Sequence, residues 1–203
     1  MAENTPVAQR RVSPWSAPNL ITIVRMFFAP GFIWLLVVSA NSPTDPARWW
    51  AVGLFVLGMA TDGVDGYVAR RFDLVTDLGK ILDPIADKVL IGGALVGLSI
   101  LGELPWWVTA LILLREVGIT VFRLAVLSDQ VIPASRGGKI KTVSQFVAIT
   151  LALAPFSAMW GQPMDIVNIV LMTWVVIITL ATGVDYLVDG IRQQRRLRRE
   201  GIE

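Results

Sequence analysis

The sequence predicts an all-α, polytopic membrane protein with six transmembrane helices and both termini in the cytoplasm. Of the 203 residues, 54% are hydrophobic and 17% are charged, and the mean hydropathy is +0.62. This composition is too apolar for an ordinary soluble domain of this size. Six apolar stretches follow one another, each about 20 residues long and so able to cross a hydrocarbon core of about 30 Å.

The elements are expected in the following order. Residues 1–18 form a polar cytoplasmic or interfacial arm, without the apolar segment and cleavage site of a secretory signal peptide. Residues 19–189 form one six-helix domain, and residues 190–203 form a basic tail that we expect to lie on anionic lipid. The six expected spans are 20–40, 49–69, 79–101, 105–127, 142–160 and 166–187.

The orientation follows from the short connections, because loops rich in Lys and Arg stay on the cytoplasmic side. Positive residues gather before the first span, between the second and third, between the fourth and fifth, and after the sixth. The alternate connections carry Arg48 or no positive residue. An aromatic belt is expected near these poorly charged connections, and the tryptophans found there are Trp49, Trp50, Trp106, Trp107 and Trp160.

The chain contains no cysteine and no histidine. Disulfides, thiolate catalysis, Ser-His mechanisms and imidazole metal sites are therefore excluded. Any acid–base or metal chemistry has to use carboxylates.

Charged residues occur inside the second, third and fourth spans, always in the cytoplasmic half. A charge at the bilayer centre costs about 3 kcal/mol unless it faces another charge, an ion or water. We therefore expect a polar cavity that opens to the cytoplasm. The fifth and sixth spans have uncharged cores and are expected to serve as scaffold or dimer surface.

Two pairs of carboxylates have helical spacing. Asp62 and Asp65 are three residues apart, Asp83 and Asp87 are four apart, and both spacings place a pair on one helix face. Because a short connection joins the two helices, all four carboxylates can converge. Oxygen ligands of this kind suit Mg²⁺ or Mn²⁺, and two ions per site would neutralise the four charges. The alternative is that these carboxylates only pair with the neighbouring cations Arg70, Arg71, Lys80 and Lys88.

A cluster of cations is expected on the other side of the cavity, formed by Arg115, Arg123, Lys139 and Lys141. Arginine can bind phosphate with two parallel hydrogen bonds and lysine adds a point charge, so this cluster is a candidate phosphate site. The alternative is that these residues only set the membrane topology and pair with Glu116.

The stretch from residue 62 to 87 reads DGVDGYVARRFDLVTDLGKILDPIAD. It resembles the signature of the CDP-alcohol phosphatidyltransferase family, D-x2-D-G-x2-A-R-x8-G-x3-D-x3-D. All eight fixed positions match: Asp62, Asp65, Gly66, Ala69, Arg70, Gly79, Asp83 and Asp87. The resemblance implies a six-helix enzyme in which Asp62, Asp65, Asp83 and Asp87 hold two divalent ions, with Asp87 also the general base.

The same resemblance implies where the CDP-linked lipid binds. Gly66, Ala69, Arg70, Thr76 and Gly79 would border the CDP moiety. The segment from Asn19 to Thr22 resembles the family's other nucleotide-contacting stretch. Asn19 has a plainer alternative as a helix N-cap after Pro18.

Within the family, residues 76–90 and 138–142 look most like the bacterial phosphatidylglycerophosphate synthases. This implies transfer of phosphatidyl from CDP-diacylglycerol to glycerol 3-phosphate, whose phosphate Arg115, Arg123, Lys139 and Lys141 would hold. Inositol phosphate, or phosphatidylglycerol in cardiolipin synthesis, are alternative acceptors. The resemblance also implies a homodimer in the bacterial cell membrane with its site facing the cytoplasm, and no nucleic-acid partner. A divalent-cation transporter is the alternative from another class, although charge occupies only one half of the spans and no inverted repeat is present.

Overall fold

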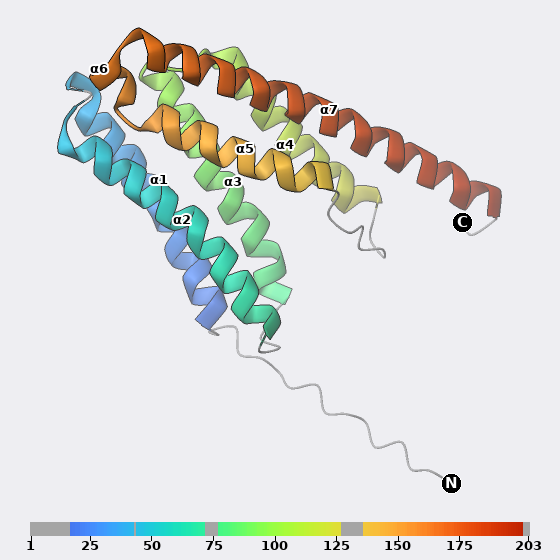
Figure 1. Ribbon diagram of the computed structural model, residues 1–203. Helices are drawn as coiled ribbons and strands as arrows, with labels where there is room; N and C mark the ends of the chain where they lie inside the picture. Colours follow the sequence, from blue (N-terminus) through green and yellow to red (C-terminus); the bar gives the residue numbers. More distant parts are fainter. Residues whose placement is uncertain (1–16, 43, 72–76, 127–135, 201–203) are drawn as a thin grey trace.

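The computed structural model describes residues 17–42, 44–71, 77–126 and 136–200, and within these ranges the regular secondary structure is all helical, with no strand. This confirms the all-α class. Figure 1 shows the helices in chain order: α1 (Ala17–Val38), the short 3₁₀ helix η1 (Ser39–Asn41), α2 (Pro46–Arg71), α3 (Asp77–Ile100), α4 (Trp106–Val126), α5 (Arg136–Leu153), α6 (Phe156–Trp160) and α7 (Gln162–Glu200).

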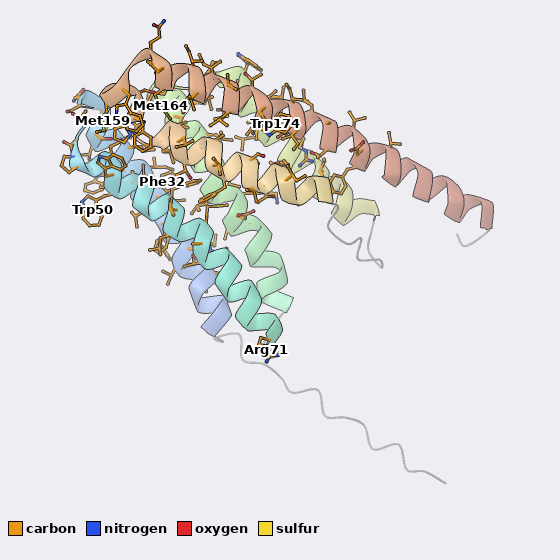
Figure 2. The ribbon with its side chains drawn as sticks, in the orientation of Figure 1. Phe32, Trp50, Arg71, Met159, Met164 and Trp174 are labelled. Atoms are coloured by element: carbon orange, nitrogen blue, oxygen red, sulfur yellow. The ribbon has the colours of Figure 1, made fainter. Side chains whose placement is uncertain are left out.

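The long helices run alternately in opposite directions, and Figure 1 shows them close together at one end and spread into two groups, α1–α3 and α4, α5 and α7, toward the other. The end where they meet, the aromatic end, holds the starts of α2, α4 and α7 together with α6, and carries the tryptophans predicted to form a belt. The opposite, spread ends, called here the basic end, include the end of α2 and the starts of α3 and α5. Figure 2 shows Trp50 and Arg71 at these opposite ends of α2. The predicted segregation of aromatic and basic residues is thus present in the fold.

Two helix groups build the core. Helix α1 packs against α2 and α3, and α7 packs against α4 and α5. The groups meet where α3 contacts α4 and α2 contacts α5. Phe32 and Phe55 contribute an edge-to-face pair with ring centroids 5.9 Å apart, and Leu90, Leu95 and Leu98 of α3 are fully buried. Helix α3 therefore lies at the centre of the fold.

Within the part of the chain that the structure describes, two helical stretches are long and apolar enough to cross a membrane, Thr22–Asn41 and Gln162–Tyr186. They correspond to the first and last predicted spans. Large apolar side chains point outward elsewhere too, and Trp50 and Leu114 are 70% and 74% exposed. An apolar exterior of this kind suits a lipid environment. The second, third and fourth predicted spans, and the side on which the termini lie, stay predictions.

The fifth predicted span, 142–160, is wrong as a single helix. Helix α5 ends at Leu153, and the separate short helix α6 begins at Phe156. Pro155 lies between them and has no backbone N–H with which to continue the α5 hydrogen bonds. Gly161, with φ of 67°, then turns the chain into α7.

The last helix is longer than the predicted span of 166–187. Helix α7 runs on without a break to Glu200, through the boundary expected at residue 190. The division into arm, domain and tail stays a prediction.

A buried arginine ties the aromatic end together. Arg48 at the start of α2 is 2% exposed. Its Nε donates to the backbone oxygen of Leu153 at 2.6 Å, and its guanidinium pairs with Glu103 in the α3–α4 connection. One side chain thus links three segments that are far apart in the sequence.

We expect Arg48→Leu to lower the free energy of unfolding by about 2 kcal/mol, since it leaves a buried carbonyl and the Glu103 carboxylate without their donor. Thermal unfolding of the purified protein in detergent measures the effect. Trp50→Leu, at an exposed position of the same helix, should change the midpoint much less. Equal midpoints for the two variants would contradict the role given to Arg48.

Candidate active site

A cavity of about 550 Å³ opens between α3, α4, α5 and α7 toward the basic end. Among the residues whose side chains the structure describes, the charged ones in its lining are Lys88, Arg115, Glu116 and Lys141. These three cations and one carboxylate make the described part of the lining positive, which suits an anion such as phosphate. The predicted phosphate ligands Arg115 and Lys141 are thus brought together, although they lie on different helices.

Arg115 is anchored to α7. Its Nε donates to the Thr179 backbone oxygen at 3.2 Å, and its Nη2 donates to Thr182 Oγ1 at 2.8 Å. The guanidinium carbon also lies 5.9 Å from the centre of the Tyr186 ring. These contacts hold the side chain in one orientation and compensate a charge that would be costly in an apolar bundle.

Glu116 joins the two predicted phosphate ligands. Its Oε1 accepts from Arg115 Nη1 at 3.2 Å and also pairs with the Lys141 ammonium, which comes from α5. Lys141 is 6% exposed. The pairing with Glu116 that the sequence left as an alternative is therefore present, yet both cations still line the cavity. Glu116 positions them, a role that the sequence did not assign to it.

Asp87 is half-buried on α3, directly before the lining residue Lys88. Among the described residues it does not itself line the cavity. Its part as the general base for a molecule held by these cations stays a prediction.

The other predicted metal ligands are placed by backbone alone. Asp62 and Asp65 lie in the last turns of α2, and Asp83 lies near the start of α3. Because α2 and α3 pack together and run in opposite directions, both carboxylate pairs belong to the basic end. The side chains of these three residues lie outside the described part of the structure. Among the side chains that are described, no group of three metal-ligating residues is found, so the metal site stays a prediction.

The predicted CDP contacts are described only in part. Gly66, Ala69 and Arg70 lie in α2 and Gly79 lies in α3, in segments whose side chains are not described, and Thr76 lies outside the described residues. Arg123 lies near the C-terminal end of α4 and Lys139 near the start of α5, and the side chains of both are outside the described part of the structure.

Helix α1 supplies a buried polar face toward α2 and α3. Thr22 and Arg25 stand one turn apart and are each 1% exposed. Arg25 was assigned no role in the site from sequence, although its spacing of three from Thr22 was a signal that both share a face. Helix α1 begins at Ala17, so Asn19 stands inside the first turn and not at the N-cap that was its alternative role.

The chain is similar to one protein family and to several named proteins. The family model of CDP-alcohol phosphatidyltransferase matches residues 15–184. A protein of Mycobacterium tuberculosis named probable phosphatidylglycerophosphate synthase is 45% identical over 174 residues, which cover 86% of this chain and 81% of that protein. A CDP-diacylglycerol–glycerol-3-phosphate 3-phosphatidyltransferase of Bacillus subtilis is 33% identical over 185 residues, with 85% and 93% covered. One of the same name from Rickettsia bellii is 37% identical, with 83% and 92% covered.

Proposed function

Since the chain belongs to the CDP-alcohol phosphatidyltransferase family, we propose that it transfers the phosphatidyl group of CDP-diacylglycerol to glycerol 3-phosphate. The products are phosphatidylglycerophosphate and CMP, within phospholipid biosynthesis. The names of the relatives from Bacillus subtilis and Rickettsia bellii support both substrates. The observation that carries the choice of a phosphorylated acceptor is the cationic cavity beside Asp87.

The cavity residues have distinct tasks in this reaction. Lys88, Arg115 and Lys141 hold the acceptor phosphate, and Glu116 keeps Arg115 and Lys141 in place. Holding the phosphate at a fixed point brings the acceptor hydroxyl to Asp87, which lowers the entropic cost of the encounter. Arg123 and Lys139 are proposed to extend the same positive surface.

Asp87 acts as the general base. It accepts the proton of the acceptor hydroxyl while the hydroxyl oxygen forms a bond to the lipid-side phosphorus. The bond from that phosphorus to the bridging oxygen breaks, and CMP leaves with the electron pair. Gly66, Ala69, Arg70, Thr76 and Gly79, with Asn19 and Thr22 of α1, are proposed to border the CDP moiety.

Asp62, Asp65, Asp83 and Asp87 are proposed to hold two Mg²⁺ or Mn²⁺ ions. Their oxygen atoms form the donor set that these cations prefer, and no histidine or cysteine is present to favour another metal. The chemistry expected of such ions is neutralisation of the diphosphate and of the departing CMP.

We place the basic end at the cytoplasmic face of a bacterial cell membrane, with six spans and both termini inside. The segregation of basic and aromatic residues to opposite ends of the bundle supports this orientation. Glycerol 3-phosphate then enters from the cytosol, and CDP-diacylglycerol enters sideways from the bilayer. A homodimer is also part of the proposal, on the strength of the family alone.

CMP release by the purified protein tests the function directly. The assay contains CDP-diacylglycerol and Mg²⁺ with glycerol 3-phosphate, inositol phosphate, phosphatidylglycerol or no acceptor. We expect release that depends on glycerol 3-phosphate. Dependence on one of the other acceptors would reject glycerol 3-phosphate while keeping the chemistry. No release from folded protein with any acceptor would reject the transferase, and flux of divalent cations in vesicles would then favour the transporter.

Gly183 of α7 offers an indirect way to move Arg115. A Cβ added at Gly183 would lie 3.4 Å from Arg115 Cγ and 3.5 Å from its Nε. Alanine therefore fits, whereas the extra methyl groups of valine push the guanidinium away from Thr179 and Thr182. We expect Gly183→Val to raise the KM for glycerol 3-phosphate about tenfold, with little change in the KM for CDP-diacylglycerol.

Gly183→Ala is the matched control and should keep both constants near those of the unmodified protein. If valine and alanine behaved alike, Arg115 would not depend on the space beside Gly183. A rise in both constants for Gly183→Val would show a general loss of structure.

A further inference from the structure

A second cavity, of about 600 Å³, lies at the aromatic end between α4, α5, α6 and α7. It takes no part in the proposed transfer reaction, because Asp87 and the cationic cavity lie toward the other end of the bundle. Its inner wall is apolar and includes Val108, Met172 and Val176. Polar groups occur at one end of it, where Glu103, Ser157 and Asp165 contribute to the lining.

The cavity is long and follows α7. Its lining residues on this helix extend from Asp165 to Ile177, a rise of about 18 Å at 1.5 Å per residue. One leaflet of a bilayer has a hydrocarbon depth of about 15 Å, half of the whole core. Along α7, Asp165 and Asn168 come first, and the residues that follow are apolar except for Thr173. In the proposed orientation, the polar part lies at the outer surface and the apolar part reaches toward the bilayer centre.

The cavity opens onto an apolar surface. Trp107, Ile169 and Ile177 line it and are 63%, 65% and 55% exposed. A molecule dissolved in the outer leaflet can therefore enter sideways, without passing through water. An acyl chain has the shape and polarity of the space that these residues enclose.

The polar end offers hydrogen-bond acceptors. Asn168 donates from Nδ2 to Ser157 Oγ at 3.1 Å, while its buried Oδ1 has no hydrogen-bond partner within the described part of the chain. Asp165 is exposed and forms no ion pair with any residue that the structure describes. The positive charge of Arg48 is already matched by Glu103. The exposed Asp165 carboxylate is therefore the acceptor that a ligand with N–H donors and a positive charge can reach.

We propose that this cavity binds one acyl chain of an outer-leaflet phospholipid with a primary ammonium head group, of the phosphatidylethanolamine type. The ammonium pairs with Asp165, and the chain lies along α7 as far as Ile177. Phosphatidylcholine has the same net charge but no N–H donor, so it occupies the cavity less well. The site depends on the membrane embedding of the chain and is independent of the transfer reaction.

Photo-crosslinking tests the site without using enzymatic activity. The full chain is reconstituted in phosphatidylcholine vesicles that contain a trace of phosphatidylethanolamine with a diazirine on its acyl chain, and crosslinked peptides are mapped by mass spectrometry. We expect crosslinks to concentrate on residues 169–177 of α7 and on the start of α4. The same diazirine on phosphatidylcholine should label these peptides about fivefold less.

Two tryptophan substitutions form a matched pair. Thr173 lines the cavity and is exposed, whereas Val170, also exposed, does not line it. Thr173→Trp fills the space and should reduce the crosslinks about fivefold, and Val170→Trp should leave them unchanged. Asp165→Asn should abolish the preference for phosphatidylethanolamine while the acyl crosslinks persist.

Three results would overturn the proposal. Crosslinks spread evenly over all exposed apolar helices would show ordinary lipid contact without a site. Equal labelling by the two phospholipids would remove the ammonium contact. Crosslinks between two copies of the chain through α7, with little lipid attached, would assign the cavity to a protein interface.

Discussion

Asp87→Asn is expected to reduce CMP release by about a thousandfold while the protein still folds and inserts. Asparagine keeps the size of the side chain but cannot accept the proton of the acceptor hydroxyl. It also removes one of the four charges proposed to hold the divalent ions. Initial rates with CDP-diacylglycerol and glycerol 3-phosphate, at saturating Mg²⁺, measure the loss.

Asp185→Asn serves as the control, since Asp185 is an exposed carboxylate of α7 outside the cavity lining. It should retain nearly full activity. Thermal unfolding of both variants separates a chemical defect from a folding defect. Near-normal turnover by Asp87→Asn would remove Asp87 as the general base, whatever the metal requirement proved to be.

Lys141→Ala is expected to raise the KM for glycerol 3-phosphate about thirtyfold, the effect of losing one charge-assisted hydrogen bond to phosphate. The KM for CDP-diacylglycerol should change far less. Lys141 belongs to α5 and lines the cavity beside Glu116. The signature residues proposed for the CDP site begin on a different helix, α2. Steady-state kinetics with each substrate varied in turn gives both constants.

The partner Glu116 complicates this variant, because Lys141→Ala leaves a carboxylate with one cation fewer. The double variant Lys141→Ala with Glu116→Gln removes that charge. If Lys141 binds phosphate, the raised KM persists in the double variant. Recovery to the original KM would show that the stranded carboxylate caused the defect. An equal rise in both substrate constants would argue against a separate phosphate site.

The acidic part of the candidate site was predictable because its geometry is local. Spacings of three and four residues place Asp62 with Asp65, and Asp83 with Asp87, on helix faces whatever the rest of the chain does. That the short connection between α2 and α3 brings the two pairs together stays a prediction, because the side chains of Asp62, Asp65 and Asp83 lie outside the described part of the structure. The segregation of charge and tryptophan was predictable for a similar reason, since it depends on order along the chain.

The cationic part was predictable only as a set of residues. Arg115 and Lys141 were named, but two of their partners come from α7, which was expected to be scaffold. Thr179 and Thr182 lie more than sixty residues from Arg115, and only the packing of α4 on α7 brings them together. The sequence of neither helix predicts that contact. A threonine that accepts a hydrogen bond from an arginine cannot be told, from sequence, from a threonine that hydrogen-bonds within its own helix.

By itself, the sequence determined the all-helical class, the separation of basic from aromatic residues and the spacing of the carboxylates. Hydropathy and helical periodicity are properties of residues that are neighbours in sequence. Only the tertiary structure decided that Glu116 holds both Arg115 and Lys141, and that a second cavity follows α7 at the aromatic end. These features depend on the angles and register at which helices pack, and many side chains distant in sequence set those quantities together.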